Sequence, residues 1–314
     1  MRWILCGKND AAADSLQFLS ERGDDVWAIG TAADDGVGGW QRSFVAEARR
    51  LGVPCEQPAR INDPAFTARL ADYGADALLS IQYDQILRGR LFRTIGCPCL
   101  NFHFALLPRH RGVSPIAFAV LMGDREAGVT LHQMVEDIDA GGILAQGRVS
   151  IRDSDTAREV YDRVSEAATA LFRETYPFDP KRLPKPIAQD EGAASYHRQG
   201  DFDFGARAVD WHRPAEELQR WLRAMIFPPF QFPETTLEDR RFQIERVAGD
   251  VGAPAAAPPG TVVDRPEGSV DVAASGGTVR IVTLIETGEG GGEMGRPIAV
   301  GDQFQSTPEG GACE

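Results

Sequence analysis

Cysteine is scarce in this sequence. Its 314 residues include an odd number of cysteines without paired spacing: Cys6, Cys55, Cys97, Cys99 and Cys313. This pattern excludes a small domain held together by disulfides and predicts free, mostly buried thiols in a reducing cytoplasm. Cys97 and Cys99 flank a proline, but no second pair of Cys or His stands at ligand spacing. We therefore expect no metal site.

Long apolar runs are also missing. A membrane helix needs roughly 18 apolar residues, and every apolar run of this chain is far shorter. The N-terminal "MRWILCGKND" has a short apolar stretch followed at once by charge, which predicts a first buried strand and not a signal peptide. With 43% hydrophobic and 25% charged residues, the composition is that of a globular protein without a membrane partner.

Positive charge is in short supply. The chain has 33 Lys and Arg against 46 Asp and Glu, a net charge of −13. Because proteins bind nucleic acids largely by neutralising phosphates, this balance disfavours nucleic acid as a partner. The segment after the first predicted strand, "GKNDAAAD", lacks the three glycines of the G-x-G-x-x-G loop. We therefore do not expect NAD or FAD as a cofactor.

The first 150 residues alternate apolar segments typical of strands with amphipathic segments typical of helices. Predicted strands lie at 2–7, 25–30, 75–82 and 97–103, and predicted helices at 8–19 and 39–52. This alternation predicts an α/β fold with a doubly wound, Rossmann-like parallel sheet. Ligands of such sheets bind beyond the carboxyl ends of the strands. Segments 80–87 and 101–108 lie at two such ends, so a single cleft can contain both.

The second half of the chain predicts two more strands, two helices and a small β module. The strands are at 128–134 and 141–151, and Thr156 with Glu159 forms a capping-box pattern that starts a helix. Pro214 stands in the first turn of the other helix. Beyond a Pro/Ala-rich stretch, apolar and polar residues alternate between turns at Gly268 and Gly276, which predicts antiparallel strands.

Asn101 and His103 lie two residues apart at the end of a predicted strand, in "NFHFALLPRHRG". Strand side chains alternate, so both project to the same side. Asn offers an N–H donor that does not titrate, and the charge of His is set near neutral pH by its neighbours. Two such donors suit the developing oxyanion of acyl transfer.

An acid is needed to hold the imidazole and to collect a proton. Asp139 lies in a tight loop between two predicted strands, where Gly141 and Gly142 allow a close backbone approach. A paired carboxylate is expected to raise the pKa of His103 and favour the imidazolium. From the residues alone, a core His accompanied by a turn Asn and a turn Asp explains the pattern equally well.

The segment 101–146, "NFHFALLPRHRGVSPIAFAVLMGDREAGVTLHQMVEDIDAGGILAQ", resembles the catalytic segment of the folate-dependent formyltransferases. That family reads approximately N-x-H-x-S-L-L-P-x-x-R-G, then G-V-T, then a D-x-G loop. The resemblance implies that Asn101, His103 and Asp139 are catalytic and that N10-formyltetrahydrofolate is the formyl donor, released as tetrahydrofolate. Ala105 departs from the pattern, since the family usually has Ser there, and we expect only a packing consequence.

The resemblance also implies a pterin pocket formed mainly by the backbone of two loops. Carried over, its residues are Tyr83, Asp84, Gln85 and Ile86 in the first loop and Val135, Glu136 and Asp137, followed by Asp139, in the second. A mostly apolar slot with backbone donors suits a flat heterocycle. A plain strand-to-helix turn remains the alternative for the first loop. The implied reaction is attack of an amine on the formyl carbon through a tetrahedral intermediate.

The acceptor side resembles the sugar-nucleotide N-formyltransferases, which implies an amino sugar attached to a nucleotide as the substrate. In those enzymes a D-W-x-x-x-A-x-x-L-x-R-x-x-R-A segment ends in a Pro-aromatic loop beside the acceptor site; it maps here to 210–230. Trp211 and Phe227 would then form an apolar wall, and Arg109 and Arg111 would contact the pyrophosphate. Core packing remains open for the two aromatic residues, and a solvated turn for the two arginines.

The C-terminal module resembles the OB-like barrel of methionyl-tRNA formyltransferases, which favours initiator tRNA as an alternative acceptor. Against this, the residues from 255 onward include nine Asp or Glu and three Arg, a net charge of −6. Such acidity disfavours a platform for tRNA phosphates. The resemblance further leads us to expect a homodimer.

The resulting domain prediction has five parts. They are a catalytic domain at 1–205, a helical and loop extension closing the acceptor site at 206–250, a linker at 251–260, an OB-like β domain at 261–305 and a tail at 306–314. Three other functions stay open: formylation of another small biosynthetic amine, hydrolysis of the formyl donor, and a non-catalytic scaffold. Release of tetrahydrofolate only in the presence of a particular acceptor would discriminate among them.

Overall fold

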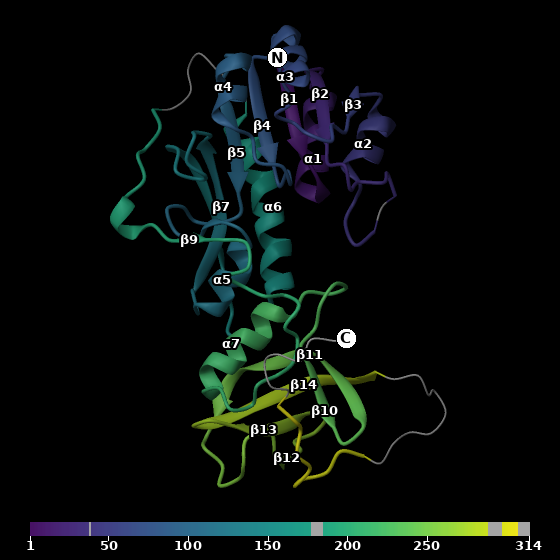
Figure 1. Cartoon of the computed structure of the whole chain (residues 1–314), viewed down its shortest axis with the longest axis vertical. Coiled ribbons are helices and arrows are strands. Elements are labelled where there is room, and N and C mark those ends of the chain that lie inside the picture. Colours follow the sequence, from purple (N-terminus) through teal and green to yellow (C-terminus); the bar gives the residue numbers. More distant parts are fainter. Residues whose placement is uncertain (38, 177–184, 288–296, 307–314) are drawn as a thin grey trace. The chain divides into compact units, whose positions relative to one another are not determined.

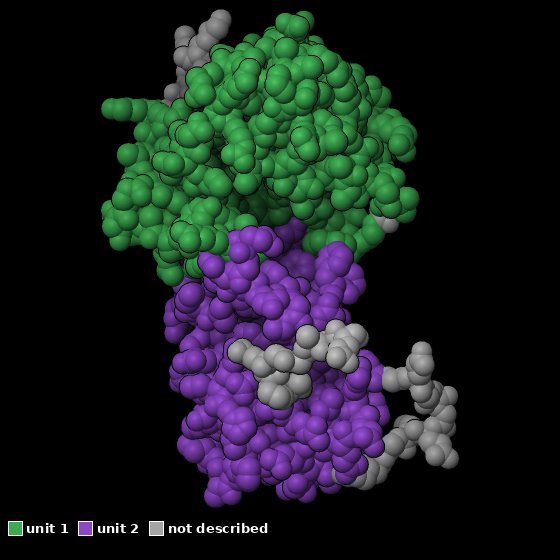
Figure 2. Space-filling model, in the orientation of Figure 1, with its two compact units in different colours: residues 1–115, 127–149, 162–198 green, residues 116–126, 150–161, 199–314 purple. Residues whose placement is uncertain are grey.

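The computed structural model describes residues 1–37, 39–176, 185–287 and 297–306. The chain forms two compact units (Figure 2). Unit 1 comprises residues 1–115, 127–149 and 162–198, and unit 2 comprises residues 116–126, 150–161 and 199–314. The five-part division at 205, 250, 260 and 305 stays a prediction. The predicted tail lies, from residue 307 on, outside the described residues.

The central sheet has seven strands in the order β3-β2-β1-β4-β5-β7-β8 (Figure 1). Their bounds are β1 Arg2–Gly7, β2 Asp25–Gly30, β3 Cys55–Glu56, β4 Ala77–Ile81, β5 Cys99–His103, β7 Glu126–Gln133 and β8 Ile143–Ser150. The first five strands in this order, β3, β2, β1, β4 and β5, are parallel, which confirms the predicted α/β class. Strand β7 runs antiparallel to β5. The carboxyl end of β5 therefore meets the middle of β7, where His103 lies opposite Thr130.

Six helices alternate along the chain with the strands of this sheet within the described residues, and α5 belongs from Ile116 on to unit 2. Their bounds are α1 Asn9–Glu21, α2 Phe44–Leu51, α3 Pro64–Tyr73, α4 Gly89–Ile95, α5 Pro115–Leu121 and α6 Ala157–Thr175. The predicted capping box is confirmed: the backbone N–H of Thr156 donates to Glu159 over 2.8 Å, and that of Glu159 donates to Oγ1 of Thr156 over 3.3 Å. Helix α2 starts later than predicted because Ser43 caps it, accepting from the N–H of Ala46.

Strand alternation determines which side chains reach the site. Phe102 of β5 packs edge-on against Phe172 of α6, their ring centroids 6.2 Å apart. Cys99 joins the apolar cluster on the opposite face, together with Phe66 of α3 and Leu91 of α4. Because side chains alternate along a strand, residues 101 and 103 lie on the face of Cys99. Apolar contacts on both faces thus anchor β5, and the face of Cys99 also carries the polar groups of Asn101 and His103 towards the carboxyl end.

Unit 1 also contains a short two-stranded sheet, formed by β6 Arg111–Gly112 and β9 Tyr196–His197. These strands are parallel, and a 3-10 turn, η1 Glu191–Ala193, precedes β9. The pairing brings residues of the segment 185–198 against the loop that follows β5. Two segments far apart in the sequence therefore build one side of the site.

Unit 2 contains α7 Ala215–Met225 and a five-stranded sheet in the order β10-β11-β14-β13-β12. Its strands, antiparallel throughout, are β10 Glu234–Leu237, β11 Arg240–Gly252, β12 Val262–Asp264, β13 Val270–Ala274 and β14 Gly277–Thr287. Strand β10 and nearly all of β11 come before the predicted linker at 251–260, and β12, β13 and β14 come after it, so one sheet contains strands from both sides of that stretch. The alternation of apolar Phe242 and Ile244 with polar neighbours was the strand signal that the sequence analysis missed.

The C-terminal described residues close this sheet. Gln303 bridges to Thr261 beside β12, and Gln305 bridges to Thr236 of β10, while Phe304 between them is 1% exposed. Both edge strands are thus covered by one segment. Among the described residues, no helix is long and apolar enough to cross a membrane.

Candidate active site

The neighbouring strands β5 and β7 carry four polar side chains on one face of the central sheet. In the antiparallel pairing of β5 with β7, Asn101 lies opposite His132 and His103 lies opposite Thr130. Directly opposite residues project to the same face, so the cross-strand partners are in reach of one another. His103 and His132 are buried and Asn101 is half-buried. The register of two strands, and not a loop, positions these groups.

The carboxamide of Asn101 contacts the imidazole of His132. Its Nδ2 lies 3.2 Å from Nε2 of His132, whose Nδ1 lies 2.9 Å from the carbonyl oxygen of Gln133. A carbonyl only accepts, so in the neutral ring Nδ1 carries the hydrogen and Nε2 accepts from Asn101. An amide nitrogen has two hydrogens, so this contact leaves Asn101 a second one to donate.

His103 is enclosed between a carbonyl and a carboxylate. Its Nε2 lies 2.8 Å from the carbonyl oxygen of His110, and its Nδ1 lies 3.5 Å from Oδ2 of Asp139. Burial lowers the pKa of His103 and outweighs the opposite influence of Asp139 and of that carbonyl. The expectation of a raised pKa is therefore wrong, because the sequence indicates the carboxylate partner but not the desolvation.

Asp139 lies between two imidazoles. Its Oδ2 faces His103 and its Oδ1 lies 3.5 Å from Nε2 of His132, while the N–H of Gly112 donates to Oδ2 over 2.9 Å. Burial alone would raise the pKa of this carboxyl, but both rings and the Gly112 N–H outweigh it and bring the pKa to about 2. The carboxylate is consequently ionised at neutral pH.

The loop that carries Asp139 is fixed by its backbone. Asp139 has a φ of 56°, in the left-handed region. Gln189 donates from Nε2 to the carbonyl oxygens of Asp139 and Gly141, over 2.6 and 2.7 Å. A Cβ on Gly141 would lie 1.8 Å from the carbonyl oxygen of Gln133, which confirms the predicted need for a close backbone approach.

The two arginines assigned to the acceptor have different surroundings. Arg109 is exposed. The side chain of Arg111 is only 9% exposed and donates to Oε1 of Gln189 and to both carboxylate oxygens of Glu191. Its guanidinium is committed to the segment that fixes Asp139, which argues against a phosphate contact and indicates a structural role.

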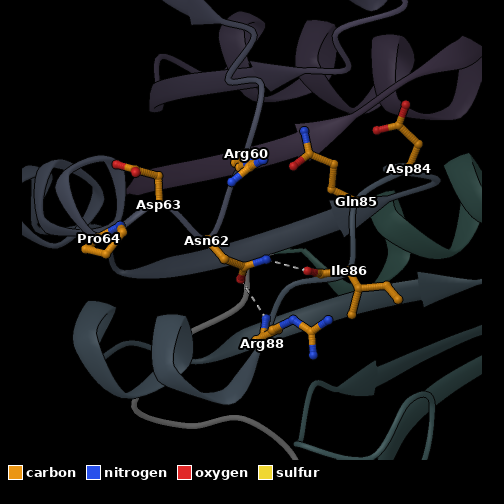
Figure 3. Close-up of a pocket in the computed structure, with 8 residues that line it drawn as sticks. All are labelled: Arg60, Asn62, Asp63, Pro64, Asp84, Gln85, Ile86 and Arg88. Atoms are coloured by element: carbon orange, nitrogen blue, oxygen red, sulfur yellow. Dashed lines mark hydrogen bonds between the residues drawn. The ribbon is translucent and has the colours of Figure 1, made fainter.

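The first predicted cofactor loop follows β4 and lines an open cavity of about 510 Å³ (Figure 3). The lining residues are Arg60, Asn62, Asp63, Pro64, Asp84, Gln85, Ile86 and Arg88. Asn62 accepts from the N–H of Arg88 over 2.9 Å and donates to the carbonyl oxygen of Ile86 over 2.7 Å. The side chain of Gln85 bonds to the backbone of Pro58 and Ile61. These bonds hold the loop in one conformation.

The cavity combines the carboxylates of Asp63 and Asp84 with the guanidinium groups of Arg60 and Arg88, either of which can bind an anionic group. The predicted residue Tyr83 is half-buried beside it, and burial, with Cys6 and Asp84, raises the pKa of its hydroxyl. In the second predicted loop, Val135, Glu136 and Asp137 are exposed. Glu136 lies 3.7 Å from Arg93 of α4, which brings the second loop close to the helix that follows the first.

Trp211 and Phe227 belong to unit 2, whereas the other predicted site residues belong to unit 1. Trp211 is 0% exposed, stacks on Phe304 and donates from Nε1 to Thr235 over 3.2 Å. It fills the core of unit 2, which argues against contact with a substrate. Phe227 is half-buried and packs against Tyr161 at 5.5 Å between ring centroids.

The structure therefore brings Asn101, His103 and Asp139 together and adds two residues that the sequence analysis missed. These are His132, through its contacts with Asn101 and Asp139, and Gln189, which holds the loop of Asp139. A polar His within an apolar strand was the available signal for His132. Nothing in the sequence linked Gln189 to a loop fifty residues away.

Comparisons with known proteins identify the family of this chain. A family model described as "Formyl transferase" matches residues 38–175, and one described as "Formyl transferase, C-terminal domain" matches residues 205–290. The methionyl-tRNA formyltransferase of Thiobacillus denitrificans is 34% identical over 284 residues, which are 89% of this chain and 90% of that protein. That of Stutzerimonas stutzeri is 32% identical over 314 residues, 98% and 96% of the two chains.

Solved structures with the same fold include sugar N-formyltransferases. The N-formyltransferase from Helicobacter canadensis, in complex with folinic acid and dTDP-3-aminofucose, has a TM-score of 0.73 at 21% identity and covers 89% of this chain and 98% of that one. WlaRD, a sugar 3N-formyl transferase with dTDP and 5-N-formyl-THF, has a TM-score of 0.71 at 21% identity, covering 89% and 96%. With both family models matched and relatives above 30% identity along nearly its whole length, this chain belongs to the folate-dependent formyltransferase family, whose formyl donor is N10-formyltetrahydrofolate.

Proposed function

We propose that this chain transfers the formyl group of N10-formyltetrahydrofolate to the primary amine of an amino sugar attached to a nucleotide. The observation that supports formyl transfer is the proximity of Asn101, His103 and Asp139 at the end of β5. The acidity of the chain supports a small acceptor over a nucleic acid. The homodimer stays a prediction.

Asn101 is the proposed oxyanion donor. When the unprotonated amine attacks the formyl carbon, negative charge develops on the formyl oxygen. The hydrogen of Nδ2 that does not bond to His132 is available to that oxygen. A fixed neutral donor stabilises the tetrahedral intermediate more than the ground state, because the charge exists only in the intermediate.

Asp139 and His103 are the proposed proton acceptors. The ionised carboxylate takes the proton of the attacking amine, directly or through water, and Nδ1 of His103 lies 3.5 Å from it. Once protonated, the imidazole has an acceptor at each nitrogen: the carbonyl of His110 and the carboxylate. The proton passes from the carboxylate to Nδ1, so this positive charge appears when the oxyanion does. The imidazolium then gives the proton to N10 of the folate, and the intermediate collapses with tetrahydrofolate as leaving group.

The proposed donor site is the pair of loops predicted from the sequence, Tyr83 to Ile86 and Val135 to Asp137. The cavity beside the first loop is of a size that accommodates part of a cofactor. Folates have carboxylates at the end remote from the pterin, and Arg60 and Arg88 line this cavity. We expect Arg88→Gln to raise the KM for the donor and to leave kcat nearly unchanged.

The acceptor proposal rests on charge and on likeness to solved structures. Two structures that share this fold are named as N-formyltransferases and were solved with dTDP or dTDP-3-aminofucose. Arg109 is exposed beside the site and is the arginine we assign to the pyrophosphate. Arg111 is omitted from this role because its guanidinium already binds Gln189 and Glu191.

A second candidate acceptor is the methionyl group of initiator tRNA. The curated relatives at 34% and 32% identity are named methionyl-tRNA formyltransferase, which favours this reading. The net charge of −13 opposes it, since tRNA binding requires neutralisation of several phosphates.

One assay tests both acceptors. Purified protein is supplied with N10-formyltetrahydrofolate and either a panel of nucleotide-linked amino sugars or methionylated initiator tRNA, and tetrahydrofolate release is followed. We expect release with an amino-sugar nucleotide and a formamide product confirmed by mass spectrometry. Release of tetrahydrofolate with the tRNA but with none of the amino-sugar nucleotides would show that the tRNA is the acceptor. Release without any acceptor would identify a hydrolase.

A further inference from the structure

His132 is a buried titratable side chain with no role in the reaction described above. It is 1% exposed and lies directly across from Asn101 in the pairing of β5 with β7. Its Nε2 is 3.2 Å from Nδ2 of Asn101 and 3.5 Å from Oδ1 of Asp139. One ring nitrogen therefore contacts two residues of the proposed catalytic trio.

The other ring nitrogen determines what Nε2 can do. Nδ1 lies 2.9 Å from the carbonyl oxygen of Gln133, which can only accept, so Nδ1 carries the hydrogen. In the neutral ring Nε2 is then an acceptor with a lone pair. An acceptor at this place is satisfied by the NH₂ group of Asn101 and repels its carbonyl oxygen Oδ1.

The two orientations of the Asn101 carboxamide are consequently unequal. In one, Nδ2 faces His132 and keeps a second hydrogen for the substrate. In the flipped one, Oδ1 would face the lone pair of Nε2, two acceptors at 3.2 Å. A carboxamide free to flip would spend part of its time presenting the wrong atom to the oxyanion.

We propose that His132 is a positioning residue that selects the orientation in which Asn101 donates to the oxyanion. The inference deepens the proposed formyl transfer and rests on it. His132 does not touch the substrate in this scheme and acts through Asn101. Nε2 also lies 3.5 Å from Oδ1 of Asp139, and with a hydrogen it would donate to that carboxylate, so the tautomer of His132 decides which of the two residues it serves.

A measurement that needs no substrate tests the structural premise. The ¹⁵N spectrum of selectively labelled histidine distinguishes the two neutral tautomers, and His132 is assigned by comparison with His132→Phe. We expect His132 to carry its hydrogen on Nδ1, with a lone pair on Nε2. A hydrogen on Nε2 would overturn the inference whatever the enzyme's activity, because such a ring cannot accept from Asn101.

Steady-state kinetics test whether loss of the His132 acceptor slows formyl transfer. His132→Phe keeps a flat ring but removes the acceptor, and we expect kcat to fall about 10- to 100-fold with the donor KM within about threefold of wild type. His132→Gln presents an amide oxygen near the position of Nε2, and we expect it to recover most of the lost kcat. A role in packing alone predicts the reverse order, because Phe fills the volume better than Gln.

A double-mutant cycle tests whether His132 acts through Asn101. In Asn101→Ala there is no carboxamide to orient, so adding His132→Phe should slow that variant no more than about twofold. An equal slowing of wild type and Asn101→Ala, or wild-type kcat in His132→Phe, would overturn the inference. Failure of the proposed function is distinguishable, since wild type would then transfer no formyl group to any acceptor while the ¹⁵N result would still decide the tautomer.

Discussion

Gln189 donates to the carbonyl oxygen of Asp139 over 2.6 Å, although fifty residues separate them in the sequence. The same amide nitrogen donates to the carbonyl of Gly141, and the amide oxygen accepts from Arg111. A single side chain thus satisfies two backbone acceptors of a loop whose central residue has a left-handed conformation. The position of the carboxylate of Asp139 depends on this distant segment.

Substitution of Gln189 by Glu should therefore impair catalysis. The variant keeps an acceptor for Arg111 but replaces both donated hydrogens by an oxygen that repels the carbonyls of Asp139 and Gly141. We expect kcat to fall at least tenfold and the free energy of unfolding to fall by about 1–3 kcal/mol. Urea denaturation and steady-state assays measure both. Glu191→Gln is the matched control: this residue is exposed, and the variant should behave as wild type.

Alanine at position 101 or 103 should nearly abolish turnover while the fold persists. Removing one oxyanion donor costs on the order of 10²–10³ in rate, and removing the imidazole removes the proton acceptor next to Asp139. Circular dichroism and thermal melting check the fold, and single-turnover assays with saturating donor measure the rate. Wild-type-like rates in either Asn101→Ala or His103→Ala would remove that residue from the mechanism.

Asp139→Asn should lose both activity and stability, the latter in a pH-dependent way. The folded-state pKa of about 2 lies below the ordinary value of 3.8, so the ionised carboxylate stabilises the fold above pH 3.8 and this contribution is lost as the pH falls towards 2. At pH 7 we expect a loss of about 2 kcal/mol relative to wild type. Urea denaturation from pH 7 to pH 3 should show the difference between the two proteins shrinking; a constant difference would contradict the assignment.

His103 should make wild-type stability fall on mild acidification. Burial lowers its folded-state pKa, so the unfolded chain binds a proton near pH 6.5 before the folded one does. The stabilising contribution is complete above that pH and is lost as the pH decreases. We expect the free energy of unfolding to decrease more for wild type than for His103→Gln between pH 8 and pH 5.5, as measured by urea denaturation. An equal decrease in both proteins would speak against the lowered pKa.

Gly141→Ala should disrupt the site from the backbone. A Cβ at this position would lie 1.8 Å from the carbonyl oxygen of Gln133, so the loop must move away from β7. We expect a loss of about 2–3 kcal/mol and at least a hundredfold lower kcat, because Asp139 moves with the loop. Thermal melting and kinetics would record this. Gly39→Ala is the control, since a Cβ at position 39 meets nothing within 4 Å.

Local features of the fold were predictable from the sequence, because they depend on neighbouring residues. The Thr156–Glu159 capping box, the α/β alternation and the shared face of residues 101 and 103 follow from spacing alone. The proximity of Asp139 to His103 was expected from the resemblance to the family. The catalytic roles of these residues remain predictions that the experiments above address.

What escaped prediction depends on contacts between distant segments. The place of His132 opposite Asn101 is set by the antiparallel register of β5 and β7, which a sequence pattern does not specify. The direction of the His103 pKa shift depends on burial by several segments, and the commitment of Arg111 depends on Gln189 and Glu191. In unit 2, β11 was missed because its pairing partner β14 lies beyond both the Pro/Ala-rich stretch and the strands β12 and β13.

The segment 303–305 has a practical consequence for anyone who shortens this chain. The N–H of Gln305 donates to Thr236 of β10 over 2.8 Å, and the two residues before the segment, Gly301 and Asp302, bond to Val262 of β12. A chain ending before Gly301 would leave two bare strand edges, which are templates for intermolecular pairing and aggregation. It would also uncover the aromatic core around Trp211 by removing Phe304. Truncations and fusions at this end should therefore begin after Ser306.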